Sequence, residues 1–136
     1  MSELKEFRDL LIEKTSFVQL AIVKENGEPH VSPVWFDLSE EDLQNNIINI
    51  NTAKGRVKAN NLKNGSSVAM VIMDPENPYR YLGIEGKIMN AIEGDVAENH
   101  IDLLAKKYLN KDKYPYRKDT EVRIKLQVKV EKVHKS

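Results

Sequence analysis

The sequence predicts a mainly β fold, an antiparallel barrel decorated by two to three peripheral helices. About six segments have the composition or the alternation of strands, and mostly short loops join them. Residues 121–133 alternate almost without a break, which puts one face of that strand in contact with water. The 136 residues and the hydrophobic content of 40% suit a single domain, residues 1–136, with one core.

The first half of the chain predicts a helix, three strands and a second, short helix. Residues 3–14 have a stripe of apolar side chains at helical spacing, and Ser2 precedes them as an N-cap. Residues 17–24 and 29–38 predict a hairpin whose returning strand has an edge or a bulge at Pro33. Residues 39–46 predict an acidic loop, residues 47–51 a strand, and residues 55–63 a helix.

The second half predicts two strands, a longer helix and the final alternating strand. Residues 67–73 have the composition of a buried strand, and residues 74–80 that of a rigid loop with two prolines. Residues 81–93 predict a long strand with bulges at Gly83 and Gly86. Asp95 is expected to cap the next helix, with Glu98 completing a capping box, and a loop at residues 111–119 leads to the last strand.

A cluster of cations follows the third predicted strand. Lys54, Arg56 and Lys58 occupy alternate positions after Thr52, and a helical pattern begins at Gly55. The first N–H groups of a helix lack internal partners, and the helix dipole favours negative charge there. Lys and Arg side chains add full positive charges. We therefore expect a phosphate group to bind here, against the alternative that these cations form a solvated helix face.

Composition excludes several classes of function. The 21 Lys and Arg residues balance the 21 Asp and Glu residues, and this neutral net charge argues against bulk attraction to nucleic acid. The chain has no cysteine, which excludes disulfides and thiolate chemistry. No segment has the ~18 apolar residues that a bilayer requires, and the N-terminus does not resemble a signal peptide. We expect a cytoplasmic protein without membrane contact.

Other chemistry-bearing residues are ambiguous from the sequence alone. The three histidines lack metal-ligand spacing, so no metal site is expected, and the acidic residues between positions 37 and 42 are expected to be solvated. Trp35 is either a core or interface aromatic, or a wall of a ring-binding pocket. The cluster Tyr79-Arg80-Tyr81 either stacks on a ring or braces a loop at a subunit interface.

Four motifs, taken together and in order, resemble those of a known superfamily. They are GEPHVSPVWF (27–36), INTAKGRVKANNL (50–62), DPENPYRYLGIEG (74–86) and HIDLLAKKYL (100–109). They make the chain similar to the FMN-binding split barrels related to pyridoxamine 5'-phosphate oxidase, and within these to the small deazaflavin-dependent oxidoreductases. The similarity runs over almost the whole chain.

This resemblance implies a six-stranded antiparallel split β-barrel that forms a homodimer, with the cofactor in a groove between the subunits. The segment after the third strand would bind the cofactor phosphate, and residues 32–35 would border the ring system. The loop at residues 74–81 would contribute to the groove from its own or the partner subunit. The expected cofactor-binding residues are Ser32, Pro33, Val34, Trp35, Asn51, Thr52, Ala53, Lys54, Arg56, Lys58, Tyr79 and Arg80.

The resemblance also implies an oxidoreductase whose cofactor carries the chemistry. We expect hydride transfer between coenzyme F-420, an 8-hydroxy-5-deazaflavin, and a small electron-poor organic substrate. Three cations suit the long anionic tail of this coenzyme better than the single phosphate of FMN, which is the alternative cofactor. Oxidation of pyridoxamine phosphate is not expected, because the strand PHVSPVWF lacks the Arg and Lys that bind phosphate in that enzyme. The sequence identifies no catalytic residue.

Two alternatives belong to other functional classes. The protein could be an FMN-binding flavoprotein, either a flavin reductase or a non-catalytic carrier or sensor. It could instead bind single-stranded nucleic acid through residues 52–63 and the tyrosines Tyr79 and Tyr81, since such proteins combine a charged groove with stacking aromatics. The neutral net charge and the poor interleaving of aromatic with basic residues argue against nucleic acid.

Overall fold

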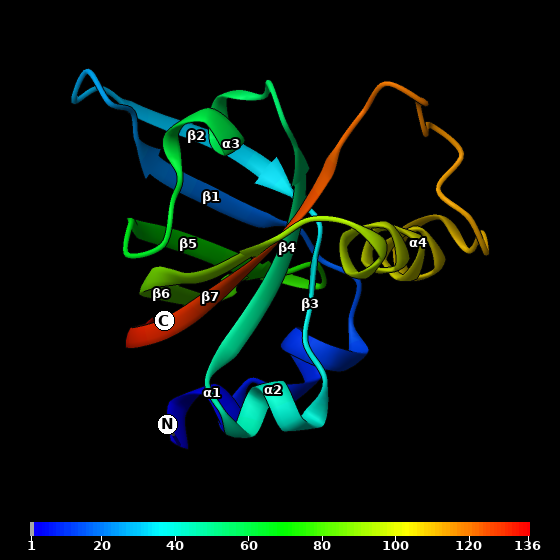
Figure 1. Cartoon of the computed structure of the whole chain (residues 1–136). Helices are drawn as coiled ribbons and strands as arrows, with labels where there is room; N and C mark the ends of the chain where they lie inside the picture. Colours follow the sequence, from blue (N-terminus) through cyan, green and yellow to red (C-terminus); the bar gives the residue numbers. More distant parts are fainter. Residues whose placement is uncertain (1) are drawn as a thin grey trace.

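Seven strands form one antiparallel sheet in a computed structural model that describes residues 2–136 (Figure 1). The strand order across the sheet is β2-β1-β5-β6-β7-β4-β3. The strands are β1 (Val18–Val23), β2 (Pro29–Val34), β3 (Phe36–Asp37), β4 (Ile47–Ala53), β5 (Ser67–Asp74), β6 (Asn77–Ile92) and β7 (Arg123–Lys135). The helices are α1 (Ser2–Glu6), a π-helical turn η1 (Asp9–Glu13), α2 (Glu40–Gln44), α3 (Val57–Asn61) and α4 (Asp95–Leu109).

Trp35 joins the two edges of this sheet. Before Trp35, the end of β2 pairs with β1, where Val34 lies opposite Val18. After Trp35, β3 pairs with β4, where Phe36 lies opposite Ile50. Strands β1 and β4 share no pairing within residues 2–136, so the barrel is closed by a continuous chain but stays split along one seam. The predicted split barrel is confirmed. The seventh strand arises because the predicted strand 29–38 is interrupted at Trp35, not at Pro33.

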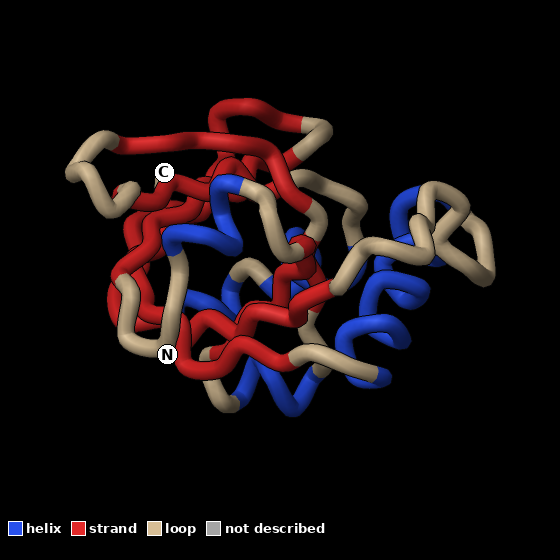
Figure 2. Tube along the Cα trace, turned by 45° about the horizontal axis from the view of Figure 1, so that its top comes forward, coloured by secondary structure: helices blue, strands red, loops and turns tan. Residues whose placement is uncertain are grey.

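The core lies between the curled sheet and the N-terminal segment. Leu4, Leu10 and Leu11 are fully buried and pack with the inward-facing residues of the strands. The predicted helix over residues 3–14 divides into α1 and a π-turn, in which Lys14 N donates to Asp9 O at 2.8 Å. The predicted cap by Ser2 lies outside the described side chains. Figure 2 shows the strands curving along one side of the molecule and α4 lying at the other.

Three local predictions were wrong for identifiable reasons. The predicted acidic loop contains α2, because Ser39 and Asp42 form a reciprocal capping box that starts a helix. Residues 77–80 belong to strand β6, since the two-proline segment forms a tight hairpin after Asp74. Helix α4 starts from Gly94, with a positive φ of 83°, and has no side-chain cap from Asp95.

Strand β6 is long and bends around the barrel. A register shift between Glu85 and Gly86 confirms the predicted bulge at Gly86, whereas Gly83 is paired regularly with His134. A Cβ on Gly86 would lie 2.4 Å from the Lys129 carbonyl oxygen, so β6 and β7 approach closely at this point because the residue is glycine. No helix within residues 2–136 is long and apolar enough to cross a membrane.

Candidate functional site

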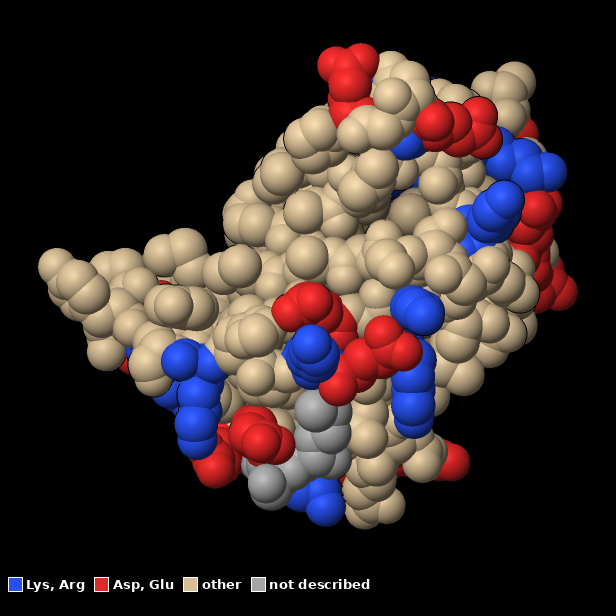
Figure 3. Space-filling view, turned by 90° about the vertical axis from the view of Figure 1, so that its left-hand side faces the viewer, with Lys and Arg blue, Asp and Glu red and all other residues tan. Residues whose placement is uncertain are grey.

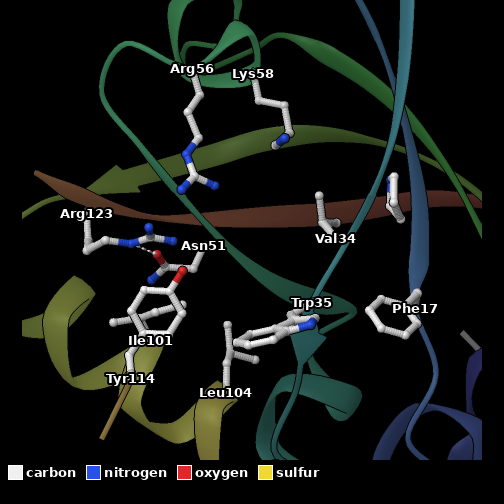
Figure 4. Close-up of a pocket in the computed structure, with 11 residues that line it drawn as sticks. Phe17, Val34, Trp35, Asn51, Arg56, Lys58, Ile101, Leu104, Tyr114 and Arg123 are labelled. Atoms are coloured by element: carbon white, nitrogen blue, oxygen red, sulfur yellow. Dashed lines mark hydrogen bonds between the residues drawn. The ribbon is translucent and has the colours of Figure 1, made fainter. Parts of the chain in front are cut away.

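A pocket opens at the seam of the barrel (Figure 4). Strands β1 and β2 border it on one side and strands β4 and β7 on the other, while α3 and α4 provide two further walls. Its cavity volume is about 180 Å³. The lining residues are Phe17, Pro33, Val34, Trp35, Asn51, Arg56, Lys58, Ile101, Leu104, Tyr114 and Arg123.

Aromatic rings form one wall of this pocket. Trp35 stacks in parallel on Tyr108, with centroids 5.0 Å apart and an interplanar angle of 4°. Tyr114 meets Trp35 edge to face at 6.1 Å, and Phe17 packs against Tyr108 at 5.4 Å. The Tyr108 hydroxyl donates to the Ser16 carbonyl at 2.5 Å and accepts from the Phe36 N–H at 3.2 Å. Burial raises the pKa of this hydroxyl, so it remains a neutral donor that fixes the ring stack.

Two cations of the α3 segment form the opposite wall. Lys58 Nζ donates to the Ser32 hydroxyl at 3.3 Å, and no carboxylate within residues 2–136 lies within 4.0 Å of it. Arg56 reaches Glu121 through a long contact of 3.5 Å. Burial, and then the neighbouring charge of Arg56, lowers the pKa of the Lys58 ammonium. An anion bound beside the two side chains would offset the repulsion between their charges.

The floor of the pocket is a chain of buried polar side chains. The Arg123 side chain is 3% exposed; its Nη1 donates to Glu121 at 2.8 Å and its Nε donates to Asn51 Oδ1 at 2.8 Å. The Asn51 amino group lies 3.1 Å from His100 Nδ1, and His100 Nε2 lies 2.8 Å from Asp37. Burial alone would raise the pKa of the Glu121 carboxyl, but Arg123 and Arg56 outweigh it and hold this pKa below its usual range.

The hydrogen-bond partners in this series of polar side chains determine which atoms of Asn51 and His100 carry hydrogens. An arginine can only donate, so Asn51 must turn Oδ1 toward Arg123 and its amino group toward His100. Nδ1 of His100 therefore accepts, and Nε2 carries the hydrogen that it donates to Asp37. The result is a directed line of hydrogen bonds that runs from the Arg123 guanidinium to the Asp37 carboxylate, and the guanidinium lies 5.3 Å from the centre of the Tyr114 ring.

Half of the predicted cofactor-binding residues come together here. The residues of that set that line the pocket are Pro33, Val34, Trp35, Asn51, Arg56 and Lys58, and Ser32 joins them through Lys58. Lys54 forms an ion pair with Glu93 at 3.1 Å and is not among the lining residues. Thr52 and Ala53 are buried, and Thr52 points to the opposite side of β4 from Asn51, as successive residues of a strand do.

Tyr79 and Arg80 lie outside the pocket of their own subunit. Arg80 forms ion pairs with Asp9 and Asp74 and lies over the Phe7 ring at 4.8 Å. Tyr79 is 88% exposed beside the β5–β6 hairpin. Neither residue lines the pocket of this subunit, and a contribution of either to the cofactor groove stays a prediction that concerns a second subunit.

Sequence reasoning missed Arg123, Tyr114, Phe17 and the α4 residues of the pocket. Arg123 lies on the polar face of the alternating strand, which predicted contact with water, yet α4 and Tyr114 cover that face at its start. Helix α3 has only five residues, so the helix predicted over residues 55–63 is shorter than expected, and binding of the predicted anion would depend on side chains more than on a helix dipole. Within residues 2–136, no group of three or more His, Asp or Glu side chains is placed to hold a metal ion.

A family comparison agrees with this architecture. Residues 4–135 match the family model described as pyridoxamine 5'-phosphate oxidase. The chain belongs to this family. The pyridoxamine 5'-phosphate oxidase family has a flavin-binding split-barrel fold, and the pocket at the seam of this chain has an aromatic wall beside two cationic side chains.

Solved structures support the same fold. The chain is similar to an F-420 reductase, with 26% identity, a TM-score of 0.76, and coverage of 93% of this chain and 94% of that one. It is also similar to General Stress Protein 26 from Bacillus anthracis str. Sterne (19% identity, TM-score 0.64, 98% and 93% covered). The heme storage protein HutZ from Vibrio cholerae shares the fold at 19% identity and TM-score 0.59, with 98% and 92% covered. A comparison with curated protein sequences gives no match.

Proposed function

We propose that this protein is an oxidoreductase that binds coenzyme F-420 at the seam pocket and transfers hydride between it and a small electron-poor organic substrate. The observation that carries the proposal is the division of the pocket into two parts. Trp35, backed by Tyr108, and Tyr114 offer an aromatic surface for a planar ring, and Arg56 and Lys58 offer positive charge whose nearest carboxylate contact is long. A deazaflavin has the matching parts, a fused ring and an anionic tail.

The cationic part of the pocket fits a phosphate for a specific reason. Two positive side chains point into the pocket side by side from the α3 segment, and Lys58 has a neutral hydroxyl as its hydrogen-bond partner. Arg presents two parallel donors to a phosphate, and Lys adds a point charge. Ser32 and Lys58 would hold the phosphate near β2, while Trp35, at the end of the same strand, would border the ring.

The chain's own residues would orient the cofactor and exclude water. When bound, a reduced deazaflavin supplies a hydride to an electron-poor acceptor, and no protein nucleophile is required. Trp35, Ile101 and Leu104 line one side of the pocket, so water would be displaced from the ring on this side. The open side of the pocket leaves access for a substrate.

The pocket of one chain is small for such a ligand. Its cavity of about 180 Å³ lies below the ~300–1,000 Å³ that ligand sites usually have. Pro33 lines the pocket and also belongs to the outer face of the sheet, in the same cross-strand row as Gln19 and Val71. We therefore propose that a second copy of the chain packs on this outer face as a homodimer and supplies the remaining wall of the groove.

FMN is the second candidate ligand. The family is flavin-binding, and the pair Arg56 and Lys58 also suits a single phosphate monoester. In that case the protein would be a flavin reductase, or a carrier or sensor without turnover. Titration of the protein with FMN and separately with coenzyme F-420, followed by fluorescence, distinguishes the two. Tighter binding of F-420 supports the proposal, and tighter binding of FMN replaces it by the second candidate.

The double substitution Arg56→Ala/Lys58→Ala tests the site itself. We expect it to weaken binding of the phosphate-bearing cofactor by at least tenfold, because two charged partners are removed from a partly buried anion. Lys54→Ala is the matched control: it removes a cation from the same segment, but Lys54 is paired with Glu93 outside the pocket. We expect Lys54→Ala to leave the dissociation constant within about twofold of wild type. Equal losses in both variants would contradict the proposed site.

A further inference from the structure

Arg123 is the least exposed cation of the pocket and the most rigidly held. Its Nε and Nη1 groups are engaged by Asn51 and Glu121, while Nη2 has no hydrogen-bond partner within residues 2–136. Asn51 cannot rotate freely, because it also donates to the Ala97 carbonyl at 3.0 Å and to His100. The remaining N–H groups of Arg123 are therefore fixed in direction before any ligand binds.

The charge of Arg123 is balanced differently from that of the other two cations. Glu121 accepts from Arg123 at 2.8 Å and is 15% exposed, whereas its contact with Arg56 is 3.5 Å and Lys58 has no carboxylate partner within residues 2–136. Arg56 and Lys58 thus offer net charge, which suits a phosphate. Arg123 offers directed donors with a largely compensated charge, which suits a neutral acceptor that gains negative charge during a reaction.

Figure 4 places Arg123 between the two parts of the pocket. Arg56 lies on its one side, and Tyr114 and Ile101 lie on the other, at the aromatic and apolar end where the ring would bind. The pyrimidine-dione edge of a flavin or deazaflavin carries ring nitrogen and carbonyl acceptors. Addition of a hydride, two electrons and one proton, to the neutral ring leaves one negative charge, which settles on this edge.

We propose that Arg123 contacts the pyrimidine-dione edge of the bound cofactor and sets its reduction potential by stabilising the reduced form. This inference rests on the proposed function of the pocket. It assigns different roles to the cations: Arg56 and Lys58 bind a phosphate whose charge is the same in both redox states, and Arg123 binds the part whose charge changes. A preorganised donor in a water-poor site stabilises such developing charge strongly.

The test compares dissociation constants for oxidised and reduced cofactor, with FMN and coenzyme F-420 as the probes. In Arg123→Gln we expect affinity for the reduced form to fall about tenfold more than affinity for the oxidised form. By linkage the bound cofactor's two-electron midpoint potential then falls by about 30 mV. In Arg56→Ala/Lys58→Ala we expect both affinities to fall alike and the potential to stay unchanged.

Glu121→Gln provides a second test that does not remove the buried arginine. The amide still accepts from Arg123 but no longer compensates its charge, so we expect the bound cofactor's potential to rise. Equal changes for both redox states in Arg123→Gln, or a potential that does not rise in Glu121→Gln, would overturn the role of Arg123 while leaving the proposed function intact. A wild-type protein that binds neither cofactor would overturn both proposals.

Discussion

At the scale of single residues, Lys107 shows how burial against a carbonyl and two rings changes a lysine. Its ammonium donates to the Phe36 carbonyl at 2.7 Å and lies 4.0 Å from the centre of the Phe36 ring. Burial lowers the pKa of Lys107 to about 8, and the nearby charge of Asp37 opposes this only in part. The ammonium is therefore less stable in the folded protein than in the unfolded chain, where the pKa is 10.5.

This lowered pKa predicts a rise in stability with pH. Below pH 8 both states are protonated and the penalty is fully present; between pH 8 and 10.5 the folded protein loses the proton first, and the penalty is removed. We expect wild type to gain on the order of 3 kcal/mol over this window relative to Lys107→Met, since one pKa unit corresponds to about 1.4 kcal/mol. Urea unfolding at several pH values measures the difference.

Lys106→Met is the control for that experiment. Lys106 is the preceding residue of α4, its side chain is 59% exposed, and its nearest acid, Asp112, is 3.7 Å away. The pH dependence of Lys106→Met is expected to match wild type. A Lys107→Met protein that retains the full pH-dependent gain would show that another group causes it.

Residue-level prediction found pocket residues where local sequence determines the environment, while their role in phosphate binding stays a prediction. Arg56 and Lys58 were identified because they follow a strand at alternate positions, and both line the pocket. Arg123 was missed because its burial is caused by α4 and Tyr114, which are separated from it in the sequence, and an alternating strand gives no signal of what covers its polar face. The role of His100 was missed for the same reason, because its hydrogen-bond partners Asn51 and Asp37 are both more than 45 positions away in the sequence.

At the scale of elements, one side chain holds the loop between α4 and β7. Asp102 accepts from the backbone N–H of Tyr114 at 2.9 Å and from Arg117 Nη2 at 2.6 Å. Burial would raise the pKa of this carboxyl, but Tyr114 and Arg117 outweigh it and hold the pKa below its usual range. Because Tyr114 is a wall of the pocket, this anchor positions part of the site.

The anchor gives a prediction for the loop. Asp102→Asn replaces a charged acceptor by a neutral one, so we expect faster amide hydrogen exchange at Tyr114 and a severalfold weaker cofactor affinity. Asp112→Asn is the matched control, because Asp112 lies in the same loop with its side chain 91% exposed. Unchanged exchange at Tyr114 in Asp102→Asn would show that the ring contacts with Trp35 and Tyr116 are enough to hold the loop.

The element predictions were wrong mainly for short segments, whose composition is compatible with both a loop and a helix. The acidic segment after Leu38 was read from its charge as a loop, while its capping residues Ser39 and Asp42 start α2. The strands were better predicted, because alternation in β7 reports one buried face directly. Residues 67–73 were expected from their composition to form a buried strand, but β5 buries only every second side chain and exposes Val71 and Met73 on the other face.

At the scale of the whole molecule, the outer face of the sheet exposes apolar side chains beside the pocket. Val31 is 63% exposed, and Val71 and Met73 on β5 are 37% and 45% exposed. Contiguous apolar surface of this kind usually marks an interaction site. On the side of the molecule shown in Figure 3, Lys and Arg lie beside Asp and Glu around a broad uncharged area, and the described residues form no basic stripe there.

The proposed homodimer is tested by one substitution on this face. We expect wild type to be a dimer at micromolar concentration, and Val71→Glu to shift it toward monomer and to weaken cofactor binding, since a charge would be buried at the interface. Leu103→Glu is the control, because Leu103 is 63% exposed on α4, away from the sheet face. Analytical ultracentrifugation measures both. A wild-type protein that sediments as a monomer would contradict the shared groove.

The seam at Trp35 has a consequence for how binding and folding are connected. One side comes from β1 and β2 in the first third of the chain, and the other comes from β4 and the last strand β7, so the pocket exists only when the entire sheet has assembled. A ligand at the seam bridges strands that share no hydrogen bonds of their own, and it acts as a reversible crosslink across the open side of the barrel. Ligand at a hundred times its dissociation constant would stabilise the protein against global unfolding by about 2.7 kcal/mol. The unfolding temperature of the intact protein would therefore report occupancy of the pocket even when no reaction is being followed.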